Sequence, residues 1–113
     1  MRRKEFSQSD TIRANMVLQT VALEFGVAPV DPACPQRRGS PQTAMARQIA
    51  LYLFHTVFQM RMARVARAFQ KHPTTARHAC RIVEASREDP VLDARLSRLE
   101  AFLRQAPVPA DAG

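Results

Sequence analysis

The stretch KHPTTARHACRIVE, residues 71–84, combines the apolar spacing of a helix with a polar opposite face. Its apolar residues recur at intervals of three and four: Ala76, Ala79, Cys80 and Val83. Pro73 can open this helix, because the first helical position needs no backbone N–H donor. The opposite face carries hydrogen-bonding side chains: Thr74, Thr75, Arg77, His78 and Arg81. The stretch therefore predicts a helix with a polar face that its own core does not need.

A shorter apolar series precedes this helix and indicates a second one. The series consists of Met62, Val65, Ala66 and Phe69, with three arginines on the outside: Arg61, Arg64 and Arg67. QKHP, residues 70–73, interrupts the pattern. A short helix, a turn of about four residues and a second helix with small core residues predict a helix-turn-helix, whose second helix enters the major groove of DNA.

The flanking sequence predicts three further helices. The first runs over residues 11–26, with Asp10 or Thr11 as its cap and Gly26 as its stop. Four prolines make residues 27–41 a long loop, and Ser40 with Pro41 then starts a helix of about five turns. Asp89 and Pro90 start the last one. The inward residues expected are Ile12, Met16, Val17, Leu18, Val21 and Phe25, then Met45, Ile49, Leu53, Val57 and Met60, then Leu92, Leu96, Leu99 and Phe102 or Leu103.

Length and composition restrict the class of protein. A chain of 113 residues, 46% of them hydrophobic, suits one small domain. No run of about 18 apolar residues and no secretory signal is evident, so we expect a cytoplasmic, nucleoid-associated protein without a membrane partner. Cys34 and Cys80 lack metal-type spacing, and the three glycines cannot form a G-x-x-x-x-G-K-[ST] loop. We expect no metal, no cofactor and no enzymatic activity.

Positive charge is concentrated in the middle of the chain. No acidic residue lies between Asp31 and Glu84. This segment carries nine basic residues: Arg37, Arg38, Arg47, Arg61, Arg64, Arg67, Lys71, Arg77 and Arg81. Such a segment attracts polyanions, and arginine suits phosphate and guanine contacts. The alternative is a basic surface that is only solvated.

Five stretches of the sequence resemble the C-terminal DNA-binding domain of the bacterial replication initiator DnaA. They are VALEFGV (21–27), RR (37–38), ARQIALYL (46–53), VARAF (65–69) and TTARHACRIVE (74–84). The resemblance covers residues 11–103 and implies a small all-α, Trp-repressor-like bundle of about five helices. In that family a basic loop reaches the minor groove while the helix-turn-helix reads the major groove. The connection QKHP is one residue shorter than the family's and lacks its acid, so we expect a different preference for DNA sites.

The resemblance and the residues together give one functional hypothesis. We expect tails at residues 1–10 and 106–113, the latter disordered, around a DNA-binding domain at 11–105. The DNA-contacting residues expected are Arg37 and Arg38 for the minor groove, Arg47 for phosphate, and Arg61, Lys71, His72, Thr74, Thr75, Arg77, His78 and Arg81 in the helix-turn-helix. The function expected is sequence-specific binding of double-stranded DNA by a transcriptional regulator or modulator of replication. The alternative is a module that binds RNA polymerase, the replication machinery or another regulatory protein, which exposed Val30 or Met60 would favour.

Overall fold

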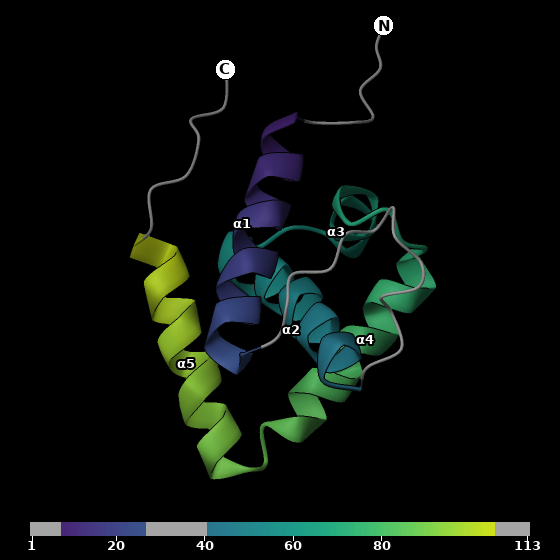
Figure 1. The fold of residues 1–113 in the computed structure, drawn as a ribbon. Helices are drawn as coiled ribbons and strands as arrows, with labels where there is room; N and C mark the ends of the chain where they lie inside the picture. Colours follow the sequence, from purple (N-terminus) through teal and green to yellow (C-terminus); the bar gives the residue numbers. More distant parts are fainter. Residues whose placement is uncertain (1–7, 27–40, 106–113) are drawn as a thin grey trace, which may run out of the picture.

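The computed structural model describes residues 8–26 and 41–105, and in these residues it contains five α-helices and no strand (Figure 1). The helices are α1 (Gln8–Phe25), α2 (Pro41–Phe58), α3 (Met62–Ala68), α4 (Pro73–Ser86) and α5 (Pro90–Gln105). The predicted all-α class and the number of helices are confirmed. The predicted loop at 27–40 and the predicted tail at 106–113 lie outside the described residues.

The start of α1 differs from the prediction. The helix begins at Gln8, three residues before the start predicted at Thr11. Asp10 is therefore not the cap but a residue of the first turn, and it is buried. The sequence pattern missed this start because the turn before Thr11 contains no apolar residue that would extend the stripe.

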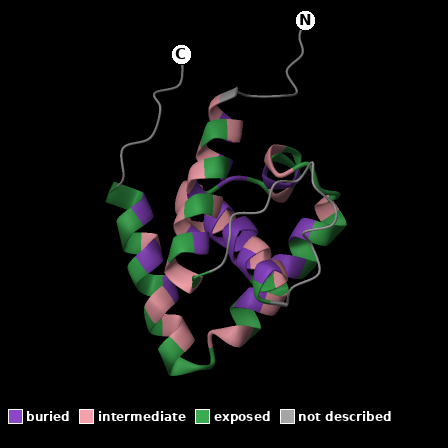
Figure 2. Ribbon diagram, in the orientation of Figure 1, coloured by how far each residue is buried: buried purple, intermediate pink, exposed green. Residues whose placement is uncertain are grey.

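Helix α2 forms the centre of the bundle and packs against all four other helices. Ile49, Leu51, Leu53 and Phe54 are almost completely buried although they point in different directions around the helix. A helix that is apolar on all sides is expected to be enclosed by its neighbours, and Figure 2 shows the buried residues concentrated along α2. The sequence predicted one inward-facing apolar stripe on this helix, whereas the buried surface of α2 extends over several of its sides.

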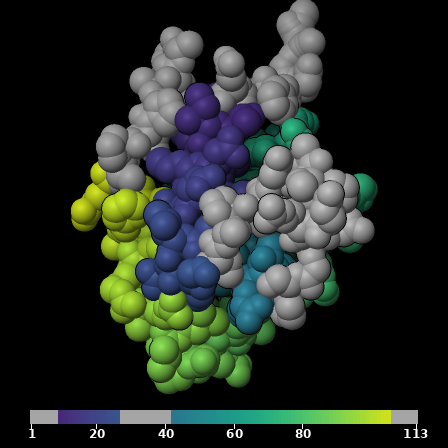
Figure 3. Space-filling view, viewed as in Figure 1, coloured from purple at the N-terminus to yellow at the C-terminus, as the bar shows by residue number. Residues whose placement is uncertain are grey.

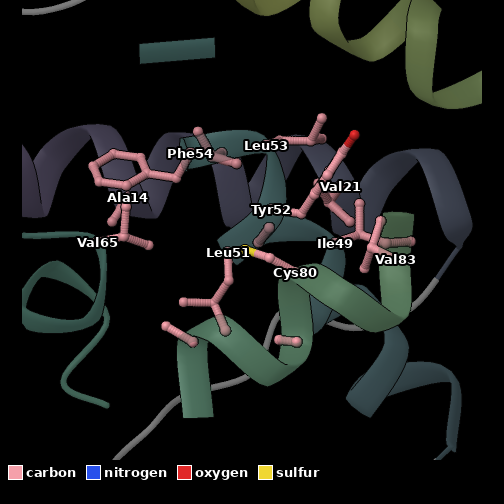
Figure 4. Close-up of a cluster of buried hydrophobic side chains, with 14 of the residues drawn as sticks. Ala14, Val21, Ile49, Leu51, Tyr52, Leu53, Phe54, Val65, Cys80 and Val83 are labelled. Carbon is pink, nitrogen blue, oxygen red and sulfur yellow. The ribbon is translucent and has the colours of Figure 1, made fainter. Parts of the chain in front are cut away.

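The core joins side chains from all five helices, and Figure 4 shows part of this cluster. The Phe54 ring meets the rings of Phe58 and Phe69 edge to face, with centroids 5.4 Å apart in each pair. Two predicted core residues, Ile12 and Met45, lie at the surface instead. Leu103 is buried, which decides the alternative left open for the last helix.

Helix α4 packs on α2 through the small residues that the sequence pattern predicted. Ala76, Ala79, Cys80 and Val83 are all buried. Small side chains allow the two helix axes to approach closely. Burial, with a smaller contribution from Glu84, raises the pKa of the Cys80 thiol to about 11. The thiol therefore serves as a small apolar core group at neutral pH.

Two arginines attach α5 to the rest of the bundle. Arg87, directly after α4, donates to the Asp93 carboxylate at 2.6 Å and to Tyr52 Oη and Glu100 Oε2 at 3.1 Å each. Burial lowers the pKa of Arg87, but these hydrogen bonds more than offset it and hold the pKa above its ordinary value. Arg95 donates to Glu24 Oε2 at 2.9 Å and stacks over the Phe25 ring. These contacts hold α5 against both α1 and α2.

Candidate nucleic-acid interface

The turn between α3 and α4 has a defined hydrogen-bonding pattern. Gln70 adopts a positive φ of 58° directly after the C-cap Phe69. The Lys71 N–H donates to the Ala66 carbonyl at 2.8 Å, and the Gln70 N–H donates to the Arg67 carbonyl at 3.1 Å. This pair of bonds is the Schellman motif, which ends α3 and turns the chain toward α4. A helix, a tight turn and a second helix thus occur where the sequence predicted them.

His72 caps the second helix of this unit. Its Nδ1 accepts a hydrogen bond from the Thr74 N–H at 3.1 Å, and Pro73 occupies the first helical position. Because Nδ1 acts as the acceptor, the ring proton of a neutral His72 is on Nε2. Only Nε2 remains for a contact with DNA, and it can donate to a phosphate oxygen. The sequence pattern had indicated His72 as a DNA contact but not as a cap.

The polar face of α4 is exposed to solvent. The exposed residues are the ones that the sequence singled out: Thr74, Thr75, Arg77, His78 and Arg81. The opposite face of the helix is buried against α2 and α3, so α4 presents one uninterrupted polar surface. Residues in the first turns of such a helix contact base edges when it enters a major groove.

A shallow pocket of about 160 Å³ lies between α2 and the start of α4. Arg47, Lys71, Thr75 and His78 line it. Predicted contacts from separate parts of the sequence therefore lie side by side. Gln48 also lines the pocket and was not predicted, although its place directly after Arg47 could have indicated it. A pocket with two cations, a hydroxyl and an imidazole can bind a phosphate oxygen at the edge of a groove.

The ion pairs divide the basic residues of the described helices and turns into two groups. Arg64 donates to both carboxylate oxygens of the buried Asp10, at 2.7 and 2.9 Å, and so joins α3 to the start of α1. The prediction placed Arg64 simply on the outside. By contrast, five predicted contact residues in the described part of the chain form no ion pair: Arg47, Arg61, Lys71, Arg77 and Arg81. Their charges are available to an anion.

Some predicted features cannot be compared with the structure or differ from it. Arg37, Arg38 and Val30 lie outside the described residues. Met60 is only 6% exposed, because its side chain packs in the core. Its backbone carbonyl also accepts a hydrogen bond from His55 Nδ1 at 2.7 Å. The apolar patch at Met60 that would have favoured a protein-binding module is therefore absent.

This geometry defines a helix-turn-helix protein. The family model described as "Bacterial dnaA protein helix-turn-helix" matches residues 14–83, which run from α1 into α4. The chain belongs to this family, and its domain is a DNA-binding domain. A search of curated proteins and a search of solved structures each found no match. Helix α5 lies beyond the matched residues.

Two further observations concern other kinds of site. Within residues 8–26 and 41–105, no group of three or more His, Cys, Asp or Glu side chains could hold a metal ion. In the same part of the chain, no helix combines the length and apolar character needed to cross a bilayer.

Proposed function

We propose that the protein binds particular sites on double-stranded DNA and acts as a transcriptional regulator or a modulator of replication. The observation that carries this proposal is the exposed, unpaired polar face of α4 beside the cationic pocket between α2 and α4. Membership of the family supports DNA as the partner.

The proposed mechanism assigns different roles to the two parts of this surface. Helix α4 enters the major groove, where Arg77 and Arg81 reach guanine edges and Thr74 and Thr75 meet a thymine methyl or a phosphate. Arg47, Lys71 and His78 hold the phosphates beside the groove. Arg61, at the start of α3, and His72, at the start of α4, contact further phosphates. Arg37 and Arg38, by the resemblance to the initiator, would reach the minor groove. No chemical step is involved.

Genome-wide occupancy mapping of the tagged protein in its bacterial host tests this function. We expect discrete binding sites in regulatory or replication-control regions, and loss of these sites in an Arg77→Ala, Arg81→Ala double variant. Changes in transcription or replication timing beside the sites would identify the regulatory role. Uniform occupancy that the double variant leaves unchanged would refute site-specific binding.

A further inference from the structure

Helices α1 and α5 expose large apolar side chains beside a groove. Leu23 of α1 is 83% exposed, and Phe102 of α5 is 56% exposed. The groove between them has a volume of about 410 Å³ and is lined by Thr20, Leu23, Glu24, Arg98, Leu99 and Phe102. A single exposed leucine needs no explanation, but two large apolar side chains on the rim of one groove are typical of an interaction site. We call this feature the α1–α5 groove.

The α1–α5 groove lies away from the helix-turn-helix. Figure 1 shows α5 and α1 toward one side of the molecule and α3 with the start of α4 toward the other. In Figure 3 the atoms of α1 and α5 adjoin on the face toward the viewer. A partner in this groove would therefore leave the polar face of α4 accessible to DNA.

The charges around the α1–α5 groove favour an acidic partner. The Glu24 carboxylate already accepts from Arg95 Nε at 2.9 Å. Arg98 is exposed and forms no ion pair within the described residues. The charged side chain of the groove that has no ion-pair partner in the described residues, Arg98, is therefore positive. A second copy would bring a like charge to this surface, whereas a carboxylate on a partner would neutralise Arg98.

We propose that the α1–α5 groove binds an amphipathic helix of another protein. The helix inserts apolar side chains, spaced three or four residues apart, between Leu23 and Phe102, and a flanking carboxylate pairs with Arg98. This inference goes beyond DNA binding, since it gives the protein a second surface that can recruit an acidic helix to a DNA site.

A displayed library of helical peptides, selected on the full-length protein, tests the proposal without requiring DNA. Counter-selection against a Leu23→Gln, Phe102→Gln double variant removes peptides that bind the basic face of α4. We expect enriched peptides to carry apolar residues at i and i+4 beside Glu or Asp. Leu23→Gln alone or Phe102→Gln alone should lower the affinity for a selected peptide by about tenfold or more, as expected for a central apolar contact. Val91→Gln is the matched control, because Val91 is an exposed apolar residue of α5 that does not line the groove.

Charge reversal separates the role of Arg98 from any effect on folding. Arg98→Glu should weaken binding of the acidic peptide. The same variant should bind a version of that peptide that has Lys in place of the acid. Three results would overturn the proposal: no enrichment over the double variant, selected peptides that are insensitive to Arg98→Glu, or a dimer in sedimentation equilibrium that Leu23→Gln dissociates. The last result would assign the groove to a second copy of the chain.

Discussion

The arginines of the described residues differ in whether a carboxylate lies within reach. Arg64, Arg87 and Arg95 each bind an acid on another structural element and so hold helices together. Arg77 and Arg81 have no such partner in the described residues and project from α4 into solvent. An unpaired, exposed arginine stays hydrated until a ligand binds. It can then form two parallel hydrogen bonds with a phosphate or a guanine.

Replacing the unpaired arginines of α4 should reduce discrimination between DNA sequences. If Arg77 or Arg81 reaches a base, its change to Ala should cost about 1–3 kcal/mol on the best site and less on random DNA. Fluorescence anisotropy titrations with both DNAs measure the difference. Arg104→Ala is the control, since Arg104 is an exposed arginine of α5, away from α4. If each variant lost the same affinity for both DNAs, these arginines would contribute only non-specific electrostatic binding.

The buried thiol of Cys80 should make the protein less stable at alkaline pH. Its pKa rises from 9.0 to about 11 on folding, so above pH 9 the unfolded chain loses the thiol proton first. The folded state then binds more protons, and the free energy of unfolding falls as pH rises, by up to about 1.4 kcal/mol per pH unit. Below pH 9 the thiol should contribute no pH dependence.

Urea unfolding at about pH 8 and about pH 10 compares the natural protein with Cys80→Ala. Other groups that titrate in this range are shared by the two proteins and cancel in the difference. We expect the natural protein to lose more stability between the two pH values than the variant. An identical loss in both would mean that the Cys80 thiol titrates normally in the folded state.

At the scale of elements, the sequence predicts best the helices that have one buried face. Helix α4 has a single apolar stripe, and its buried residues and its start at Pro73 agree with the prediction. Helix α2 is buried on several sides, so neighbours of the predicted stripe such as Leu51 and Phe54 belong to the core as well. The Asp10–Arg64 pair was beyond sequence reasoning, because it depends on how α1 packs against α3.

In the candidate site, too, features of a single helix could be predicted from the sequence, and features that depend on packing between helices could not. The exposed face of α4 follows from helical periodicity alone, whereas the pocket between α2 and α4 needs the packing of two helices. His72 illustrates a third case. The sequence indicates a polar residue before Pro73, but only the structure shows its ring accepting from the Thr74 N–H. Local pattern thus predicts faces, and tertiary packing decides which faces meet.

The turn of the helix-turn-helix offers a test at the scale of one element. Gln70 has φ of 58°, a region in which a side chain is strained and glycine is not. Gln70→Gly relieves about 1–2 kcal/mol of left-handed strain and costs about 0.5–1 kcal/mol of unfolded-chain entropy, so it should stabilise the protein by up to about 1 kcal/mol in urea unfolding, with DNA binding unchanged. Gln70→Val is the opposite control, because a β-branched residue is disfavoured there and should destabilise the protein. Destabilisation by both changes would show that the Gln70 side chain itself supports the turn.

At the scale of the whole molecule, the unpaired charges should make DNA binding strongly dependent on salt. Each neutralised phosphate contributes about −0.9 to the slope of log affinity against log salt concentration. If about five phosphates are contacted, the slope should be about −4 to −5. Lys71→Ala should reduce its magnitude by about 1, and Arg104→Ala should leave it unchanged. Affinity that does not respond to salt would exclude the phosphate contacts assigned to the pocket between α2 and α4.

The whole molecule should also prefer DNA sites other than the recognition box of the initiator that it resembles. The turn before α4 sets the depth and register of the helix in the major groove. Here the Schellman turn at Gln70 leads directly to His72, whose ring caps the helix, and to Pro73, which fixes the first helical position. The acid that the family carries before its paired threonines is missing, and with it a possible acceptor for a cytosine amino group.

Losing one or two base contacts, at about 1–3 kcal/mol each, is enough to remove or redirect a preference for one box. The phosphate contacts from α2 and the turn should persist, so overall affinity for DNA should remain. Selection from a random duplex library with the full-length protein measures the preference directly. The same selection with His72→Asn, which keeps a capping side chain, shows whether Nε2 of His72 contributes to it. Enrichment of the initiator's box as the leading sequence would mean that the shortened turn does not shift α4 in the groove.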